Sequence, residues 1–252
     1  MEKLLLTIQM TNLSVNVNKI AWLRNARGEG KPDLIEMSKV LIDCGVAGLT
    51  VHPRPDLRHI TPDDVYELSV LCKEKGVEFN IEGNPFSGET AIYPGFLRLV
   101  NETSPDQCTL VPDSEDQLTS DHGWNITEKD HNKILDLISQ IPDETRKSFF
   151  VDPVESHIEA INKLGSDRIE LYTGPYASNP NADSIAPYAK AYNFAKKLGL
   201  GVNAGHDLDL NNLKFFLAKV PAEEVSIGHA LISDALIYGL EKTTLKYIDL
   251  CK

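Results

Sequence analysis

The chain has 252 residues, 42% of them hydrophobic and 25% charged, with a formal net charge of −12 and a pI of about 5.0. These values are typical of a globular protein with a full core, and the acidic balance argues against nucleic acid or an anionic membrane as a partner. No stretch approaches the roughly 20 apolar residues of a membrane span. Residues 1–10 lack a basic leader and a cleavage site, so we expect a first strand or its lead-in there.

The four cysteines are predicted to be reduced, packed thiols in a cytoplasmic protein. Cys44, Cys72, Cys108 and Cys251 show no CxxC spacing and no close pairing with histidine. This pattern disfavours both structural zinc and a disulfide framework.

Short apolar segments alternate with amphipathic ones along the chain, which is typical of parallel α/β proteins. In chain order, the expected strands are residues 13–17, 48–51, 78–81, 107–111, 148–151, 168–172, 201–203 and 225–227. Helix start signals follow two of them, with Thr61 and Asp152 as predicted N-caps, each directly before a proline. Gly76 and Gly165 are predicted to end these helices.

Eight strand–helix units predict one closed (β/α)8 TIM barrel that occupies residues 1–252 as a single domain. A doubly wound open sheet is the competing α/β architecture. It would normally carry a GxGxxG turn after its first strand, and this sequence has none there. The long polar segment 112–125 after the fourth strand is predicted to be an active-site lid.

Polar side chains gather at the predicted carboxyl ends of the strands, where barrel enzymes carry out their chemistry. In chain order they are Asn16, Asn18, Lys19, His52, Arg54, Glu82, Glu170, His206 and His229, the last directly after Gly228. Imidazole titrates near neutrality, and burial shifts a glutamate toward it. Three histidines beside an acid therefore favour repeated proton transfers over a purely structural role.

Two regions of the sequence are candidates for binding phosphate. The loops after strands 7 and 8 contain Gly205 and Gly228, and barrels often bind phosphate there on backbone N–H groups. The loops after strands 1 and 2 crowd six basic residues, which are Lys19, Arg24, Arg27, Arg54, Arg58 and His59. Two phosphorylated substrates or one bisphosphate would explain both regions, whereas a solvated basic rim would explain only the second.

Other chemistries fit the sequence less well. A metal site of His52, Glu82, His206 and His229 would draw its ligands from scattered strands, and no predicted strand contains a lysine for Schiff-base chemistry. We therefore expect neither a metal nor an organic cofactor.

Seven segments in order resemble the pyridoxine 5'-phosphate synthase family of vitamin B6 biosynthesis. They are SVNVNKIAWLRNARG (14–28), GLTVHPRPDLRHI (48–60), FNIEG (79–83), TLVPD (109–113), IELYTGPYA (169–177), GVNAGHDL (201–208) and SIGHALISDAL (226–236). The resemblance implies a transferase that joins 3-amino-2-oxopropyl phosphate to 1-deoxy-D-xylulose 5-phosphate. The implied products are pyridoxine 5'-phosphate, phosphate and water. It also implies a ring-like homo-octamer in which an arginine from a neighbouring subunit completes the site.

The resemblance also implies roles for individual residues. His52 and Glu82 match the two general bases, and His206 matches the general acid. The remaining positions are matched to substrates: Asn16, Arg27, Gly228 and His229 to the aminoketone phosphate, Arg54, His59 and Thr119 to the sugar phosphate, and Glu170 to an active-site carboxylate.

Three positions depart from the family pattern. The usual Asn-x-Asp-His after the first strand has Asn18 and Lys19 as its last two residues here, and the usual Gly-His-Gly after the seventh ends in Asp207. An acid beside a phosphate is unfavourable unless its side chain turns away, so only the backbone N–H of Asp207 is expected to help.

Two alternative functions stay open from the sequence. A phosphosugar isomerase or epimerase could use His52 and Glu82 as a proton-transfer pair on one substrate. A non-catalytic barrel that carries pyridoxine phosphate would be favoured by the changes at Asn18, Lys19 and Asp207.

Overall fold

The computed structural model describes residues 10–114 and 116–252, so most of the expected lead-in at residues 1–10 lies outside the described residues. Eight parallel strands close into a barrel in sequence order, and Ser14 of the first strand pairs with Ser226 of the eighth. The strands are β1 (Asn12–Asn16), β2 (Gly48–Val51), β3 (Glu78–Gly83), β4 (Gln107–Leu110), β5 (Arg146–Val151), β6 (Arg168–Tyr172), β7 (Gly201–Gly205) and β8 (Glu224–Ile227). The predicted (β/α)8 barrel is confirmed.

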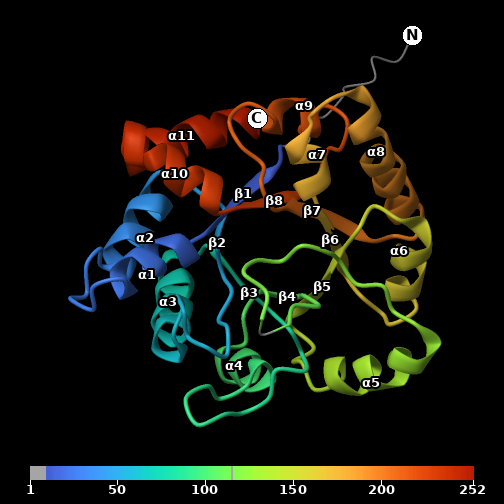
Figure 1. The fold of residues 1–252 in the computed structure, drawn as a ribbon, viewed down its shortest axis with the longest axis horizontal. Helices are drawn as coiled ribbons and strands as arrows, with labels where there is room; N and C mark the ends of the chain where they lie inside the picture. The colour runs from blue at the N-terminus through green and yellow to red at the C-terminus, as the bar shows by residue number, and fades with distance from the viewer. Residues whose placement is uncertain (1–9, 115) are drawn as a thin grey trace.

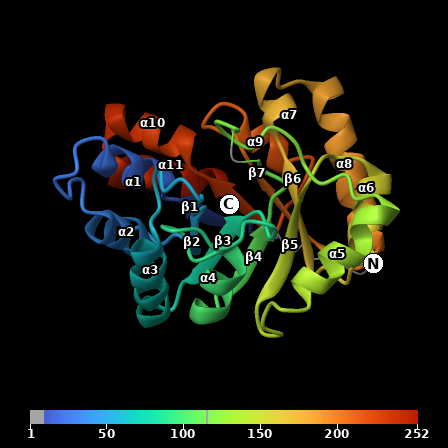
Figure 2. The same ribbon diagram turned by 60° about the horizontal axis from the view of Figure 1, so that its bottom comes forward.

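Helices surround the strands as an outer ring (Figure 1). They are α1 (Asn18–Asn25), α2 (Leu34–Asp43), α3 (Pro62–Lys75), α4 (Phe96–Thr103), α5 (Glu128–Ile138), α6 (Glu155–Asn162), α7 (Gly174–Ser178), α8 (Ala182–Lys197), α9 (Leu213–Leu217), α10 (His229–Tyr238) and α11 (Leu240–Leu250). Figure 2 shows the strands running side by side inside this ring. Within residues 10–114 and 116–252, no helix is long and apolar enough to cross a membrane.

The cap predicted for α3 is confirmed in full. The Thr61 hydroxyl accepts from the Asp64 N–H, the Asp64 carboxylate accepts in return from the Thr61 N–H, and Pro62 is the first helical residue. The helix ends at Gly76 in the left-handed conformation that glycine adopts without strain. Gly165 is likewise left-handed and follows the end of α6.

The cap predicted at Asp152 is wrong. α6 begins at Glu155 with Val154 at its N-cap, because the Asp152 carboxylate instead accepts from the Gly123 N–H at 3.3 Å. Asp152 thus contributes to fixing the long loop after β4 rather than starting a helix.

Side chains of opposite character alternate along each strand. Apolar residues such as Val15 and Leu49 are fully buried in the hydrophobic core. Their neighbours form a polar ladder across the strands, in which the Ser14 and Thr50 hydroxyls lie 2.7 Å apart and Thr109 donates to Asn80 at 3.2 Å. Because successive strand residues point to opposite faces, this polar ladder fills the barrel interior beneath its carboxyl-end mouth.

Candidate active site

A cavity of about 370 Å³ opens at the carboxyl ends of the strands. Its walls include residues that the sequence singled out at strand ends, in loops or by the resemblance: Asn16, Asn18, Lys19, His52, Arg54, His59, Glu82, Thr119, Glu170, His206, Asp207, Gly228 and His229. A second cavity of about 380 Å³ shares His52 and Arg54 with it, is also lined by Asp113, and extends toward the loop before α4. The first cavity and this neighbour therefore bring the candidate proton-transfer groups and several cations together.

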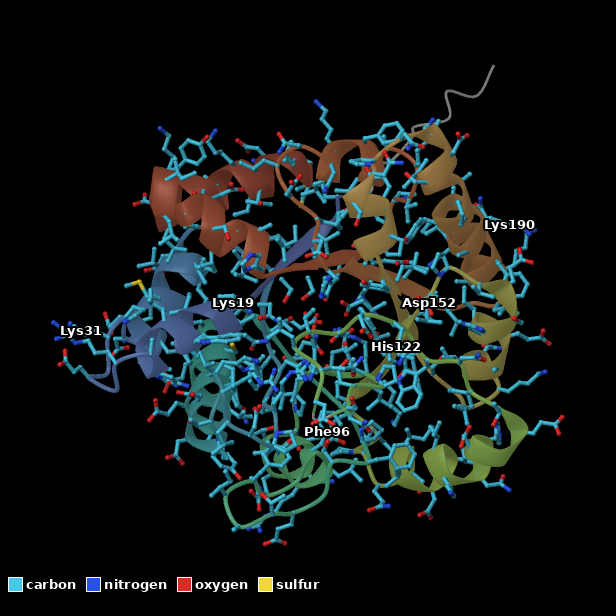
Figure 3. All side chains as sticks on the ribbon, viewed as in Figure 1. Lys19, Lys31, Phe96, His122, Asp152 and Lys190 are labelled. Atoms are coloured by element: carbon cyan, nitrogen blue, oxygen red, sulfur yellow. The ribbon has the colours of Figure 1, made fainter. Side chains whose placement is uncertain are left out.

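Among the residues that the resemblance matched to catalysis or to a substrate, Arg27 alone lines neither cavity. Its side chain is 79% exposed and pairs with Glu29 at 3.2 Å. The loop between α1 and α2 that follows it extends outward from the barrel, as the label of Lys31 shows in Figure 3. Within a single chain, Arg27 cannot be counted among the groups around the cavity.

His52 lies between two carboxylates. Its Nδ1 is 3.7 Å from Glu82 Oε2, and its Nε2 is 3.6 Å from Asp113 Oδ2. All three side chains are at least 88% buried. Such an imidazole can take a proton from a reacting group and share the resulting charge with either acid.

The sequence reasoning missed Asp113. Its carboxylate forms a salt bridge with Arg54 and accepts from the Ser120 hydroxyl at 2.9 Å. The signal was its position three residues after the end of β4, as the last residue of the segment TLVPD. Because Arg54 is paired with Asp113, its guanidinium group is held in one orientation at the cavity wall.

Glu82 is surrounded by neutral hydrogen-bond donors. Asn16 Nδ2 donates to its Oε2 at 3.3 Å and Ser226 Oγ donates to its Oε1 at 3.4 Å. Asn16 thereby orients the carboxylate, in addition to the substrate contact predicted for it.

Glu170 is fully buried on β6. Burial first, and then the Glu82 and Glu224 carboxylates, raise the pKa of Glu170 well above its ordinary value. Its Oε2 has no hydrogen-bond partner among the described residues. Glu82 and Glu170 are thus two carboxyl groups in different environments, a pattern that separates a base from a proton-holding acid.

His206 is held from several sides. Its Nδ1 lies 2.8 Å from Asp207 Oδ2, its Nε2 lies 2.9 Å from Thr119 Oγ1, and its ring packs edge-on against Tyr172 at 5.3 Å between centroids. The Asp207 side chain therefore turns to the histidine.

The backbone at His206 and Asp207 is strained, with φ values of 81° and 62°. A left-handed non-glycine residue costs roughly 1–3 kcal/mol unless its surroundings enforce it. Thr173 Oγ1 donates to the Gly205 carbonyl at 2.7 Å and also bonds to that of His206, and Asn212 Nδ2 donates to the Asp207 carbonyl at 3.2 Å. These bonds hold the loop in its unfavourable conformation.

A side chain would crowd its neighbours at Gly205, the last residue of β7, and at Gly228, which follows β8. A Cβ at position 205 would lie 2.2 Å from Glu170 Oε1, and one at position 228 would lie 3.0 Å from Asn16 Cβ. Gly228 also stands at the N-cap of α10, whose first turn starts at the cavity wall. Its free N–H groups and the positive end of the helix dipole suit an anion.

The basic residues after strands 1 and 2 divide into two groups. Arg24 is turned from the cavity toward the α3 cap, where it forms a salt bridge with Asp64. Lys19 and Arg54 line the cavity, and Arg58 borders its extension. Burial first, and then the charges of Arg54 and Arg58, lower the pKa of Lys19. Binding of an anion reduces the repulsion among these neighbouring positive charges.

Two residues in this region act without charge. His59 Nδ1 accepts from the Ile60 N–H at 2.9 Å, and burial, followed by the charges of His52, Arg54 and Lys19, lowers the pKa of His59 to about 2. A neutral His59 can offer only an Nε2–H donor. Asn18 Oδ1 accepts from the His52 N–H at 2.9 Å and thereby ties the start of α1 to the end of β2.

The loop expected to be a lid lies across the cavity. Thr119 reaches His206, Ser120 reaches Asp113, and the Gln117 carbonyl accepts from Arg58 Nη1 at 3.0 Å. Trp124 anchors the C-terminal end of this loop, because its backbone N–H donates to the Phe150 carbonyl at 2.8 Å. Figure 3 labels Lys19 on the α1 side of the mouth and His122 in the loop.

The described residues contain no cluster of three or more His, Cys, Asp or Glu side chains arranged to hold a metal ion. All four cysteines lie in the described part of the chain and are free thiols, and burial raises the pKa of Cys72, Cys108 and Cys251 to about 12. The side chains that line the cavity supply imidazoles, carboxyls, hydroxyls and cations.

Fold and site together define a (β/α)8-barrel protein with an acid–base cluster and cationic walls at its mouth. Solved structures share the fold at low identity. Thiamine phosphate pyrophosphorylase from Pyrococcus furiosus matches with a TM-score of 0.60 and 11% identity, covering 97% of this chain and 96% of that one. Tryptophan synthase from Mycobacterium tuberculosis matches with a TM-score of 0.65 and 12% identity, covering 96% and 93%.

Sequence comparison gives the family. Residues 13–252 match the model of the pyridoxal phosphate biosynthesis protein PdxJ, and the chain belongs to this family. Pyridoxine 5'-phosphate synthase of Xanthomonas axonopodis pv. citri is 52% identical over 248 residues, covering 96% of this chain and 97% of that protein. The enzyme of the same name from Xylella fastidiosa is 51% identical over 248 residues, covering 96% and 95%. The resemblance found in the sequence is confirmed, and the chain is an enzyme of vitamin B6 biosynthesis.

Proposed function

We propose that the protein condenses 3-amino-2-oxopropyl phosphate with 1-deoxy-D-xylulose 5-phosphate. The products are pyridoxine 5'-phosphate, one inorganic phosphate and two waters. The observation that carries this proposal is one cavity in which His52 lies between Glu82 and Asp113 and shares its walls with His206 and Glu170. Imine formation, phosphate elimination and ring closure each move protons, and this cluster supplies both acceptors and donors.

In this reaction His52 is the first general base. It takes a proton at an imidazole nitrogen, and the adjacent Glu82 carboxylate, 3.7 Å away, stabilises the imidazolium. Glu82 is the second base, kept oriented by Asn16 and Ser226. His206 acts as the general acid, and Glu170 supports the developing charge as a proton-holding carboxyl beside Glu82.

The two phosphates are assigned to opposite walls. Lys19, Arg54, His59 and Thr119 face the sugar phosphate, with Asn18 keeping Lys19's helix in place. The backbone N–H groups at Asp207, Gly228 and His229, with Asn16, face the aminoketone phosphate. The first wall uses fixed charges and the second uses the start of α10, so the two anions do not compete for the same donors.

We also propose a cytoplasmic homo-oligomer, an octamer by family resemblance, in which all 252 residues form one catalytic domain per subunit. Arg27 supports assembly, because its exposed side chain pairs with Glu29 at the surface and lines neither cavity of its own chain, where a neighbouring subunit could meet it. Exposed apolar side chains on α10, with Leu236 at 80% and Ile237 at 74%, supply surface for a contact. Analytical ultracentrifugation tests this, and a monomer at micromolar concentration would refute it.

The activity is tested with both substrates and with each alone. Purified protein should form pyridoxine 5'-phosphate, seen by its absorbance after chromatography, only when both are present. Conversion of a single phosphosugar to an isomer would assign the protein to the isomerase or epimerase alternative. Tight binding of pyridoxine 5'-phosphate without turnover would assign it to the non-catalytic alternative.

A further inference from the structure

The contact between Asp207 and His206 fixes which ring nitrogen of the histidine faces the substrate. A carboxylate can only accept a hydrogen bond, so His206 Nδ1, 2.8 Å from Asp207 Oδ2, must carry a proton. In the neutral ring, Nε2 is then the acceptor, and the Thr119 hydroxyl donates to it at 2.9 Å. Nε2 is therefore the nitrogen available to exchange a proton inside the cavity.

We propose that Asp207 is a positioning residue for proton transfer: it holds His206 by Nδ1, directs Nε2 to the substrate and serves as the counter-ion of the imidazolium. The proposal rests on the role of His206 as general acid given above. It assigns to the Asp207 side chain a part in catalysis separate from the anion contact of its backbone N–H.

The loop geometry supports a fixed pair rather than a chance contact. Both residues are in the left-handed region, and Thr173 and Asn212 hold the carbonyls on either side of the pair. The histidine side chain is 21% exposed, and Tyr172 covers it edge-on. An adjacent aspartate and histidine also occur at Asp121 and His122, but there the histidine side chain is 53% exposed, whereas the two aspartates are comparably exposed at 62% for Asp121 and 49% for Asp207.

The charges around His206 also favour an ionised Asp207. The pKa of Asp207 is lowered, first by the hydrogen bond from His206 and then by the charges of His206 and His229. Burial of the carboxylate opposes this shift but does not cancel it. The other groups around the pair are Tyr172 from β6, which packs against the His206 ring, Glu170, whose carboxyl lies beside Gly205, and Asp121 and Asp152, whose charges act on Tyr172. Burial and neighbouring carboxylates raise the pKa of Glu170, whereas Asp207 is in direct contact with the imidazole.

The experiment compares Asp207→Asn and Asp207→Gly with His206→Ala and with Glu159→Gln, which removes an exposed carboxylate on α6. Asparagine tolerates left-handed backbone and keeps the shape of the side chain, so Asp207→Asn removes mainly the charge. We expect the alkaline limb of its kcat–pH profile to move down by about one pH unit and kcat at pH 8 to fall about tenfold, because the imidazolium loses its counter-ion. Both KM values should stay within about twofold, and Glu159→Gln should match the wild type throughout.

A second readout does not depend on activity. Nitrogen-15 NMR of the imidazoles, assigned with His206→Ala, should show the Nδ1–H tautomer for neutral His206 in the wild type and a shift toward Nε2–H in Asp207→Gly. Unchanged pH profiles in both Asp207 variants together with an unchanged tautomer would overturn the inference. If His206→Ala keeps wild-type kcat, the proposed role of His206 fails instead, and the tautomer measurement still decides whether Asp207 holds the ring.

Discussion

Removing the charge of Lys19 should weaken binding of the sugar phosphate selectively. Lys19 lines the cavity with its Nζ 4.2 Å from the centre of the Trp22 ring, so its position is set by that aromatic face. Methionine at this position keeps most of the apolar stem and removes the ammonium group. Lys19→Met therefore tests the charge with little change in packing.

The size of the effect follows from two opposing contributions. A charge-assisted contact to phosphate contributes about 1–3 kcal/mol. Loss of Lys19 also relieves the repulsion from Arg54 and Arg58 that lowers the pKa of Lys19. We expect the lower part of that range, about 1–2 kcal/mol, which corresponds to a five- to 30-fold rise in KM for 1-deoxy-D-xylulose 5-phosphate.

The assay measures initial rates with each substrate varied at saturation of the other. Lys190→Met, which removes an exposed lysine paired with Glu155 at 3.7 Å on the outer surface, is the matched control (Figure 3). KM for the aminoketone phosphate should change less than twofold. Lys19→His should recover sugar-phosphate binding only at acidic pH, because burial and the neighbouring cations oppose protonation there. Equal KM changes for both substrates, or none, would refute the assignment of Lys19 to the sugar-phosphate wall.

Three further predictions follow from the site and the core. His52→Ala and Glu82→Gln should each lower kcat by about 100-fold or more while circular dichroism stays native, as expected of general bases; a wild-type kcat in either folded variant would remove that residue from the mechanism. Treatment with EDTA should leave turnover intact, and loss that one divalent metal restores would contradict metal-independent chemistry. Burial and then Glu78 raise the pKa of Glu224 to about 8, so the folded state keeps a proton that the unfolded chain releases near pH 4.3. The free energy of unfolding of the wild type should therefore fall as the pH rises from about 4.3 to about 8. In urea unfolding, the free energy of unfolding of Glu224→Gln should rise relative to that of the wild type by roughly 1.4 kcal/mol per pH unit across this window. A pH-independent difference would show that Glu224 ionises normally.

The strand pattern was readable from the sequence because each strand carries fully buried apolar residues between turn signals. β2 and β6 have their predicted bounds, and the other strands differ by at most two residues at an end. β3 and β7 extend further than predicted, through Gly83 and Gly205, because parallel pairing with a neighbouring strand continues past the apolar run. Pairing depends on the partner strand, which a local pattern does not contain.

The helix caps show the same limit. Thr61 caps α3 as its sequence predicts, since all the partners of that cap lie within four residues. Asp152 has the same kind of sequence around it, but the Gly123 N–H from the loop after β4 takes its carboxylate. A tertiary partner thereby overrides a local preference.

Within the site, the sequence could place side chains at strand ends but not determine their charges. Asp113 was missed because its function depends on Arg54 and Ser120, which are distant in sequence. His59 was grouped with the cations, yet burial keeps it neutral. Arg24 is directed to Asp64 instead of the cavity, and the outward position of Arg27 depends on the loop between α1 and α2.

The most direct test of the proposed reaction is the stoichiometry of its products. With both substrates at saturation, the protein should release one inorganic phosphate for each pyridoxine 5'-phosphate formed, measured together in one time course, and neither should appear when either substrate is omitted. Phosphate release from one substrate alone, or consumption of both without pyridoxine 5'-phosphate, would contradict a single condensation carried out by the His52, Glu82 and His206 cluster.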